Sequence, residues 1–383
     1  MKKLFALMLA ALLILALVAC GNGDAKETAP QDDDEKTAQK NTLTVASGEF
    51  VYDVNEDGDY EIVDYIPKST AIVELLELPA QSDDKRDIVG IADNAFKAEL
   101  SIKAVKIPDT YTYIGDYAFY DCDNLTTVTM GNTVTTVGEY AFATCDVLTA
   151  VTVSGAWSVI EEGTFKDCVA LTSITLPESV TTIESMAFFG CKELTAIGLT
   201  DKLESVTKHA FYGCDKLAYK VEGNAKYLGT AENPYLVLVS AIDLNVDLCT
   251  VNAGTKIIAN EAFANCEYLD TVALNGALKV ISNACFTGCE ALEYNEYENG
   301  YYLGNEENPY MVLCSLIIPS VEDFKLHADT VIITAEAFEN CHNLEDISYG
   351  KTEEDWNKII KTENWNHDLI IEVTYAAAQQ PEA

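Results

Sequence analysis

The segment from Asp53 to Asp64 has the residue spacing of a calcium-binding loop. Oxygen-bearing side chains stand at its first, third, fifth and twelfth positions and Gly58 at its sixth, an arrangement that lets carboxylates and an amide surround Ca²⁺. Such a loop needs a helix on each side, whereas residues 50–52 and 62–63 are β-branched or aromatic and favour strands. The sequence therefore predicts a hairpin with its turn at 55–58, and weak calcium binding is the alternative. The candidate ligands are Asp53, Asn55, Asp57 and Asp64.

Cysteine and histidine are the other side chains that could bind a metal or catalyse a reaction. The chain has 12 cysteines but no Cys-x-x-Cys pair, so a structural zinc site is not expected. No nucleophilic-serine motif, His-Glu-x-x-His motif or glycine-rich phosphate loop occurs. The four histidines stand where surface or turn residues are usual. We therefore predict no enzymatic activity, no catalytic residues and no cofactor.

The charge of the chain excludes one large class of partners. The 62 acidic side chains against 24 basic ones give a formal net charge of −38. A nucleic-acid-binding protein needs the opposite sign, because neutralising phosphates supplies most of its affinity. The hydrophobic fraction of 49% is that of a folded protein, so the charge must lie on a folded surface.

The first 41 residues predict export and membrane anchoring. A basic start and a short apolar run over 4–18 have the layout of a secretory signal peptide, covering 1–19. The residues around Cys20 resemble a bacterial lipobox, which implies cleavage before Cys20 and acylation of its thiol. Acyl chains partition into the bilayer at about 0.8 kcal/mol per methylene, enough for several chains to hold the protein at a membrane. The polar, acidic stretch 20–41 then serves as an extended tether.

A 23-residue repeat organises the rest of the chain. A small residue followed by phenylalanine recurs at intervals of 23, except for two intervals of 52. Within a unit such as 171–194 the first half alternates with the period of a strand, as in Ile174-x-Leu176. One unit cannot bury its apolar residues alone, whereas stacked units form a continuous core, so the fold class is a β-rich solenoid. The recurring phenylalanines are Phe96, Phe119, Phe142, Phe165, Phe188, Phe211, Phe263, Phe286 and Phe338.

Two inserts account for the two long intervals. The similar segments 227–235 and 302–310 lie 75 residues apart, and each belongs to a stretch of about 29 extra residues, near 219–247 and 294–322. Strand-like residues flank a turn in each, which predicts two β-hairpin inserts. Trp356 and Trp365 near the end predict a terminal module over 346–376 that closes the last coil, with carbohydrate binding as the less favoured alternative.

These units are similar to the BspA-type leucine-rich repeat of bacterial surface proteins, over about residues 42–375. The resemblance implies a domain order of N-terminal hairpin cap and first repeat at 42–90, repeat solenoid with inserts at 91–345, C-terminal cap at 346–376 and a disordered tail at 377–383. It also implies a protein of the cell surface that attaches to other macromolecules.

Stacked coils also make a prediction about the cysteines. Eight of them lie three residues after a repeat phenylalanine and form a column that faces the core. Parallel stacking keeps neighbouring Cβ atoms about 4.8 Å apart, beyond the ~3.8 Å usual in disulfides. Free buried thiols are therefore favoured over disulfides. The eight are Cys122, Cys145, Cys168, Cys191, Cys214, Cys266, Cys289 and Cys341.

Strands of the repeat expose a face that is small, nearly neutral and rich in threonine. Residues on the outside of such strands form the natural contact surface of a solenoid, although threonine is also common in strands for conformational reasons. The candidate binding residues are Thr126, Thr127, Thr129, Thr149, Thr152, Thr172, Ser173, Thr175 and Thr195. Aromatic residues after the phenylalanines and in the inserts form a second set, which packing between coils explains almost as well. These are Tyr120, Phe189, Tyr212, Tyr235 and Tyr310.

We therefore expect an exported protein, lipid-anchored to the bacterial cell membrane on its extracellular side. Its solenoid is expected to bind a protein or glycoprotein on a host or microbial surface, the partner class that the family resemblance implies. Nucleic acid is not expected as a partner. The alternative is a structural or stalk protein of the envelope without a dedicated partner.

Overall fold

The computed structural model describes residues 41–153, 155–207, 209–362, 365–367 and 369–376. Residues Lys40–Ala383 form one compact unit. The predicted signal peptide, the tether before residue 41, Cys20 and the tail at 377–383 lie outside the described residues. Within the described part, no helix is long and apolar enough to cross a bilayer.

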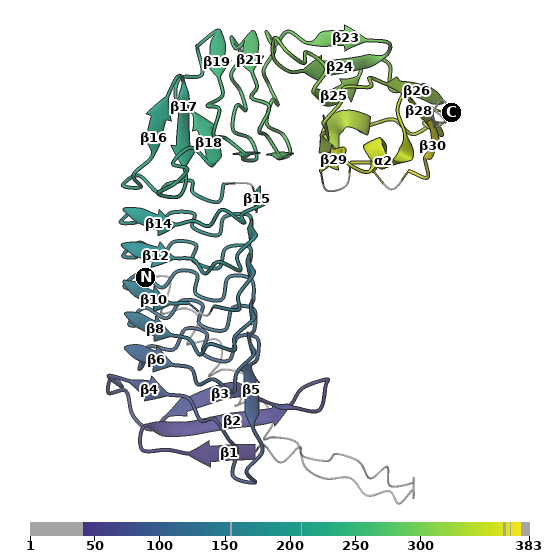
Figure 1. Cartoon of the computed structure of the whole chain (residues 1–383). Helices are drawn as coiled ribbons and strands as arrows, with labels where there is room; N and C mark the ends of the chain where they lie inside the picture. The colour runs from purple at the N-terminus through teal and green to yellow at the C-terminus, as the bar shows by residue number, and fades with distance from the viewer. Residues whose placement is uncertain (1–40, 154, 208, 363–364, 368, 377–383) are drawn as a thin grey trace, which may run out of the picture. The chain divides into compact units, whose positions relative to one another are not determined.

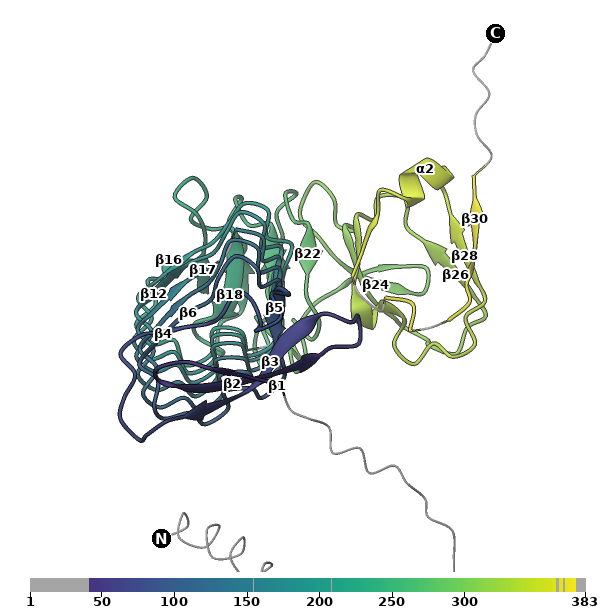
Figure 2. The ribbon, with the colours of Figure 1, turned by 90° about the horizontal axis from the view of Figure 1, so that it is seen from below.

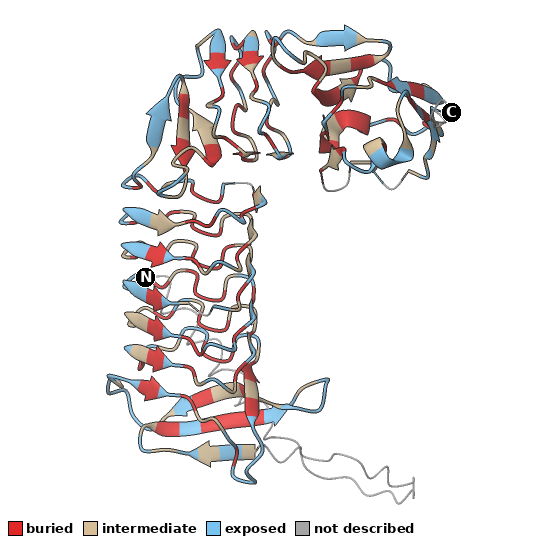
Figure 3. Cartoon of the chain, viewed as in Figure 1, coloured by how far each residue is buried: buried red, intermediate tan, exposed pale blue. Residues whose placement is uncertain are grey.

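Two parallel ladders of short strands build the coils (Figure 1). Strands of the first ladder pair one coil with the next, as Val128 pairs with Val151 and Ile174 with Ile197, each 23 residues apart. Their central residues are buried and the residues on either side face outward (Figure 3). Before the first insert this ladder comprises β4 (Leu76–Glu77), β6 (Ala104–Lys106), β8 (Thr127–Thr129), β10 (Ala150–Thr152), β12 (Ser173–Thr175) and β14 (Ala196–Gly198).

The second ladder follows a turn in each coil. Seen along the stack, it lies on a different side from the first ladder, which leaves room for the core between them (Figure 2). Its strands are β5 (Ile88–Ile91), β7 (Tyr113–Ile114), β9 (Thr136–Val137), β11 (Val159–Ile160), β13 (Thr182–Ile183) and β15 (Ser205–Val206). A continuous buried core runs through these coils, from Phe50 of the N-terminal sheet to Leu217 and beyond.

Phenylalanine rings stack through the centre of that core. Consecutive rings from Phe96 to Phe211 lie 4.8–5.7 Å apart with interplanar angles of 6–18°. Such parallel stacking follows from the repeat itself, because each ring occupies the same position in its coil. All these rings are buried.

An antiparallel sheet covers the first coil. It consists of β1 (Asn41–Thr44), β2 (Gly48–Val54) and β3 (Tyr60–Pro67), and β3 continues in parallel into β5 of the second ladder. The predicted hairpin at 50–63 is therefore confirmed, with β2 and β3 joined by a turn. Phe50 and Tyr65 pack 5.1 Å apart and bring the sheet onto Phe96.

Each insert is larger than a hairpin. The first forms three antiparallel strands, β16 (Lys220–Glu222), β17 (Ala225–Leu228) and β18 (Val237–Ala241), and β18 pairs in parallel with β20 (Ile257–Ile258) of the next coil. The third strand thus joins the second ladder. The same arrangement recurs in the second insert with β23 (Asn295–Tyr297), β24 (Gly300–Leu303) and β25 (Val312–Leu316), where β25 pairs with β27 (Ile332–Ile333).

The coils resume after each insert. Strands β19 (Leu248–Thr250) and β21 (Thr271–Ala273) continue the first ladder, and β22 (Val280–Ile281) continues the second. After the second insert come β26 (Asp323–Leu326), β28 (Asp346–Tyr349) and β30 (Glu372–Tyr375) in the first ladder and β29 (Ile360–Lys361) in the second.

The only helices of the described chain are short and lie near its end. These are the 3-10 helix η1 (Ala335–Phe338) and the α-helix α2 (Glu353–Trp356), whose first turn Thr352 caps by accepting from the Asp355 N–H. Trp365 packs on Phe338 at 5.8 Å and on the buried Trp356 at 6.0 Å. The tryptophans therefore cover the last phenylalanine, as a terminal cap requires, and Trp356 is not open to a sugar ring.

Candidate functional site

The threonine face is exposed along the first ladder. Its candidate residues flank the buried Val128, Val151 and Ile174, so the strand pleat directs them away from the core. Seven of the nine are exposed and the other two are half-buried. Exposed are Thr129, Thr149, Thr152, Thr172, Ser173, Thr175 and Thr195, and half-buried are Thr126 and Thr127.

One column of this face has a structural role. The hydroxyl of Thr126 donates to the Lys103 carbonyl at 2.9 Å and that of Thr149 to the Thr126 carbonyl at 3.1 Å. Thr195 repeats the contact with the Thr172 carbonyl at 3.0 Å. These hydroxyls tie each coil to the preceding one, so they are already committed within the protein.

The hydroxyls of the remaining columns are available to a ligand. Within the residues that the structure describes, we find no hydrogen bond from the side chains of Thr127, Thr129, Thr152, Ser173 or Thr175. Around β10 and β12 the surface is hollowed into a groove of about 540 Å³, from Thr149 to Pro177. The groove therefore combines apolar and hydroxyl-bearing side chains in a regular array.

The face carries little unpaired charge. Near its N-terminal end, Lys103 lies 2.6 Å from Glu74 and Lys106 lies 3.0 Å from Glu77, so the two lysines are matched by acids of the preceding coil. All four side chains are largely exposed, and such pairs contribute little to stability. Hydrogen bonding and shape, rather than charge, would thus govern binding in the groove.

The five aromatic candidates do not form one site. Phe189 and Tyr212 stack at 5.3 Å, and Tyr212 is 64% exposed. Tyr120 lies at another coil, beside Lys97, whose ammonium is 5.2 Å from its ring. The two insert tyrosines pack edge-on within their own inserts, Tyr235 on Tyr227 at 5.4 Å and Tyr310 on Tyr302 at 5.7 Å.

The calcium candidates are likewise spread along the hairpin. Asn55 uses its side-chain oxygen to accept from the N–H groups of Asp57 at 3.1 Å and Asp59 at 2.9 Å, which closes the turn. Asp64 pairs with Val51 farther along the ladder, so it does not meet the turn residues. No group of three or more histidines, cysteines and carboxylates suited to a metal occurs in the described ranges.

All eleven described cysteines are free and buried. The thiols of the ladder donate to the carbonyl of the phenylalanine 26 residues earlier, as Cys145 does to Phe119 and Cys168 to Phe142, both at 3.1 Å. Burial raises the pKa of Cys168 well above its ordinary value, and it raises that of Cys266 to about 11. Since the thiolate is the reactive form, these cysteines have a packing role and no nucleophilic one.

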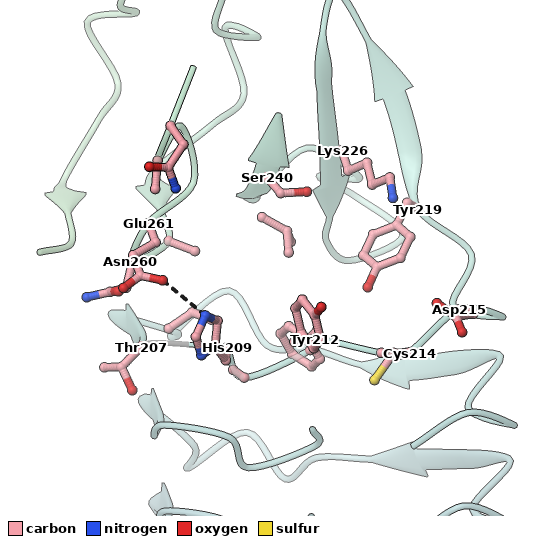
Figure 4. Close-up of a pocket in the computed structure, with 18 residues that line it drawn as sticks. Thr207, His209, Tyr212, Cys214, Asp215, Tyr219, Lys226, Ser240, Asn260 and Glu261 are labelled. Carbon is pink, nitrogen blue, oxygen red and sulfur yellow. Dashed lines mark ion pairs between the residues drawn. The ribbon is translucent and has the colours of Figure 1, made fainter. Parts of the chain in front are cut away.

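The sequence did not reveal a second concavity, which lies beside the first insert. His209 and Glu261 approach to 3.0 Å across it, and it encloses about 710 Å³ (Figure 4). The 52-residue interval from Phe211 to Phe263 was the available signal, because it marks the place where successive phenylalanine turns stop stacking.

The comparison with protein families matches this chain to the BspA type leucine rich repeat region. Six copies of the repeat are found, over residues 89–218 and 243–359. A search of curated proteins finds no match.

Solved structures of bacterial leucine-rich repeat proteins are similar to the chain. A leucine-rich cell surface protein from Faecalibacterium prausnitzii is 21% identical, with 88% of this chain and 95% of that one covered and a TM-score of 0.40. A protein from Bacteroides ovatus is 19% identical, covering 87% and 100%, with a TM-score of 0.42. The T. pallidum leucine-rich repeat protein is 23% identical, covering 65% and 90%, with a TM-score of 0.39.

Proposed function

Because the chain belongs to the BspA-type leucine-rich repeat family, we propose that it is a non-enzymatic bacterial surface protein that binds another macromolecule through its threonine face. The partner is a protein or glycoprotein on a host or microbial surface, and acylated Cys20 anchors the chain to the cell membrane. Adhesion is the biological role of this contact.

One observation carries the proposal: the array of hydroxyls without internal partners over the groove at β10 and β12. Side chains in this array stand on rigid strands, so a partner that binds there orders few of them, and little entropy is lost. Each hydroxyl can both donate and accept, which suits the mixed polar groups of a protein or glycan surface. Non-enzymatic binding is supported by the absence of catalytic motifs in the sequence and by buried, high-pKa cysteines.

The first prediction tests the face directly. Thr152→Tyr and Thr175→Tyr each place a ring in the groove while keeping a residue that favours strands. We expect each change to weaken binding of the purified protein to immobilised matrix proteins or epithelial cells by about tenfold or more, as loss of a central contact does. Surface plasmon resonance and cell-adhesion counts measure this.

Thr136→Tyr is the matched control, because Thr136 is an exposed strand threonine of β9 in the other ladder. It should bind as the unmodified protein does. Equal binding by all variants would place the contact elsewhere on the molecule. Failure of the unmodified protein to bind any matrix protein or cell surface at physiological salt would favour the stalk role.

A further inference from the structure

The turns at the repeat phenylalanines form a backbone ladder of their own. The N–H of Phe188 donates to the Ala210 carbonyl at 2.9 Å, and that of Gly190 donates to the Tyr212 carbonyl at 2.8 Å. Earlier coils repeat this pattern. Each step of the ladder therefore joins two N–H groups, two residues apart, to two carbonyls that are also two residues apart in the next coil.

The first insert ends this ladder. In the described part of the chain, the N–H groups of Phe211 and Gly213, which occupy the next positions, donate no hydrogen bond. The carbonyl of Ala262, which would accept from Phe211 in an unbroken stack, instead accepts at 2.7 Å from Ala241, the last residue of β18. Two backbone donors thus remain unpaired beside the insert.

These donors line the concavity between the two turns, which we call the junction cleft. It lies between residues 206–215 on one side and 259–265 on the other, with Lys226 and Ser240 of the insert closing a third side (Figure 4). The Oδ1 atom of Asn260 is buried there without a hydrogen-bond partner. The cleft therefore offers unpaired donors and an unpaired acceptor together.

The second insert shows what such a junction contains when the chain fills it. The cavity there has only about 180 Å³, and the Glu336 carboxylate accepts from the N–H of Ala284. Counting 75 residues back, the equivalent positions are Glu261 and His209, which pair through their side chains at 3.0 Å. At the first junction the carboxylate is thus engaged by the imidazole, and the cleft has about 710 Å³.

We propose that the junction cleft binds a short, extended, basic peptide segment of a partner protein. Two backbone donors two residues apart match the carbonyls of an extended peptide, as in strand addition to a sheet. A peptide N–H can satisfy Asn260, whose unpaired acceptor is otherwise costly. The net charge of −38 and the exposed Asp215 at the cleft favour lysine or arginine side chains, whose stems can lie on Tyr212.

A random octapeptide library displayed on phage is the probe. Panning against the purified protein should enrich basic peptides, and a synthetic copy of an enriched peptide should bind in fluorescence anisotropy. Asn260→Leu and Tyr212→Ala should each weaken that peptide by about tenfold or more. Tyr268→Ala, at a tyrosine that is 60% exposed and outside the cleft, should leave its affinity unchanged. Melting temperatures verify that each variant is folded.

Amide hydrogen exchange supplies the readout for the backbone contact. Bound peptide should slow exchange at Phe211 and Gly213, and Thr152→Tyr should not alter this, since the groove at β10 and β12 is a separate site. No enrichment of peptides, affinity unchanged in both cleft variants, or binding without protection of these amides would overturn the proposal. Binding of glycans from an array in the cleft, without peptide binding, would assign it to a saccharide instead.

Discussion

A single side chain in this protein takes its chemistry from the coil spacing, as the cysteine ladder shows. Because each coil places its cysteine beneath the preceding phenylalanine turn, the thiol donates to a carbonyl and is closed off from water. The pKa of Cys191 is raised well above the usual value by its contact with Cys214 and by burial. A buried thiol acts as a small apolar residue with a weak donor, and it is protected from oxidation by the same enclosure.

Thiol labelling tests this at the residue scale. At pH 8 the native protein should react with a maleimide reagent at least about a hundredfold more slowly per thiol than the unfolded chain, because only exposed thiolates attack. Mass spectrometry after timed quenching counts the labels. A Thr136→Cys variant should gain one fast-reacting thiol. Rapid labelling of several cysteines in the folded, unmodified protein would contradict the buried ladder.

Among the elements, the phenylalanine stack and the inserts have opposite effects on the core. Stacking makes each ring bury the next, whereas an insert interrupts the column and leaves the terminal ring with fewer neighbours. Phe165 lies fully buried between Phe142 and Phe188. Phe286 stacks on Phe263 at 5.6 Å, is only half-buried, and precedes the second insert.

The two positions should differ in stability measurements. Phe165→Ala removes a buried ring and should lower the free energy of unfolding by about 3–5 kcal/mol. Phe286→Ala should cost less than half as much, because that ring gives up less buried area. Urea titrations followed by circular dichroism give both values. Equal losses would show that the end of a stack is packed as tightly as its middle.

For the whole molecule, the excess of acids works against the folded state. Glu139 has its pKa raised by burial and by the neighbouring Asp116 and Glu162, and Glu161 by burial and by Glu184. Only a few described carboxyls, such as those of Asp243 and Asp355, have a lowered pKa, and both are exposed. Like charges held near one another in the folded chain account for the difference.

The pH and salt dependence of the melting temperature should follow. A carboxyl with a raised pKa binds its proton more tightly in the folded state, so its contribution to stability increases as the pH falls toward that pKa. We expect the melting temperature to rise from pH 8 to about pH 5 and to rise with added NaCl at pH 7.5, since salt screens exposed charges. Scanning calorimetry measures both. A melting temperature that fell on either change would show that favourable ion pairs outweigh repulsion.

The repeat by itself determined the coils, the stacked phenylalanines, the hairpin at residues 50–63 and the exposed threonine face. These features depend on contacts between equivalent residues 23 apart, so one period of the sequence specifies them everywhere. It also placed the cysteines in a column where a disulfide does not fit.

Only the tertiary structure decided which of those groups have partners. The sequence could not separate Thr149, whose hydroxyl bonds the previous coil, from Thr152, whose hydroxyl does not, because both are exposed strand threonines. Nor did the 52-residue interval reveal that β18 would take the Ala262 carbonyl and leave Phe211 and Gly213 without acceptors. An insert's length is written in the sequence, but its hydrogen-bond partners depend on how its strands meet the coils, and such contacts have no period to read.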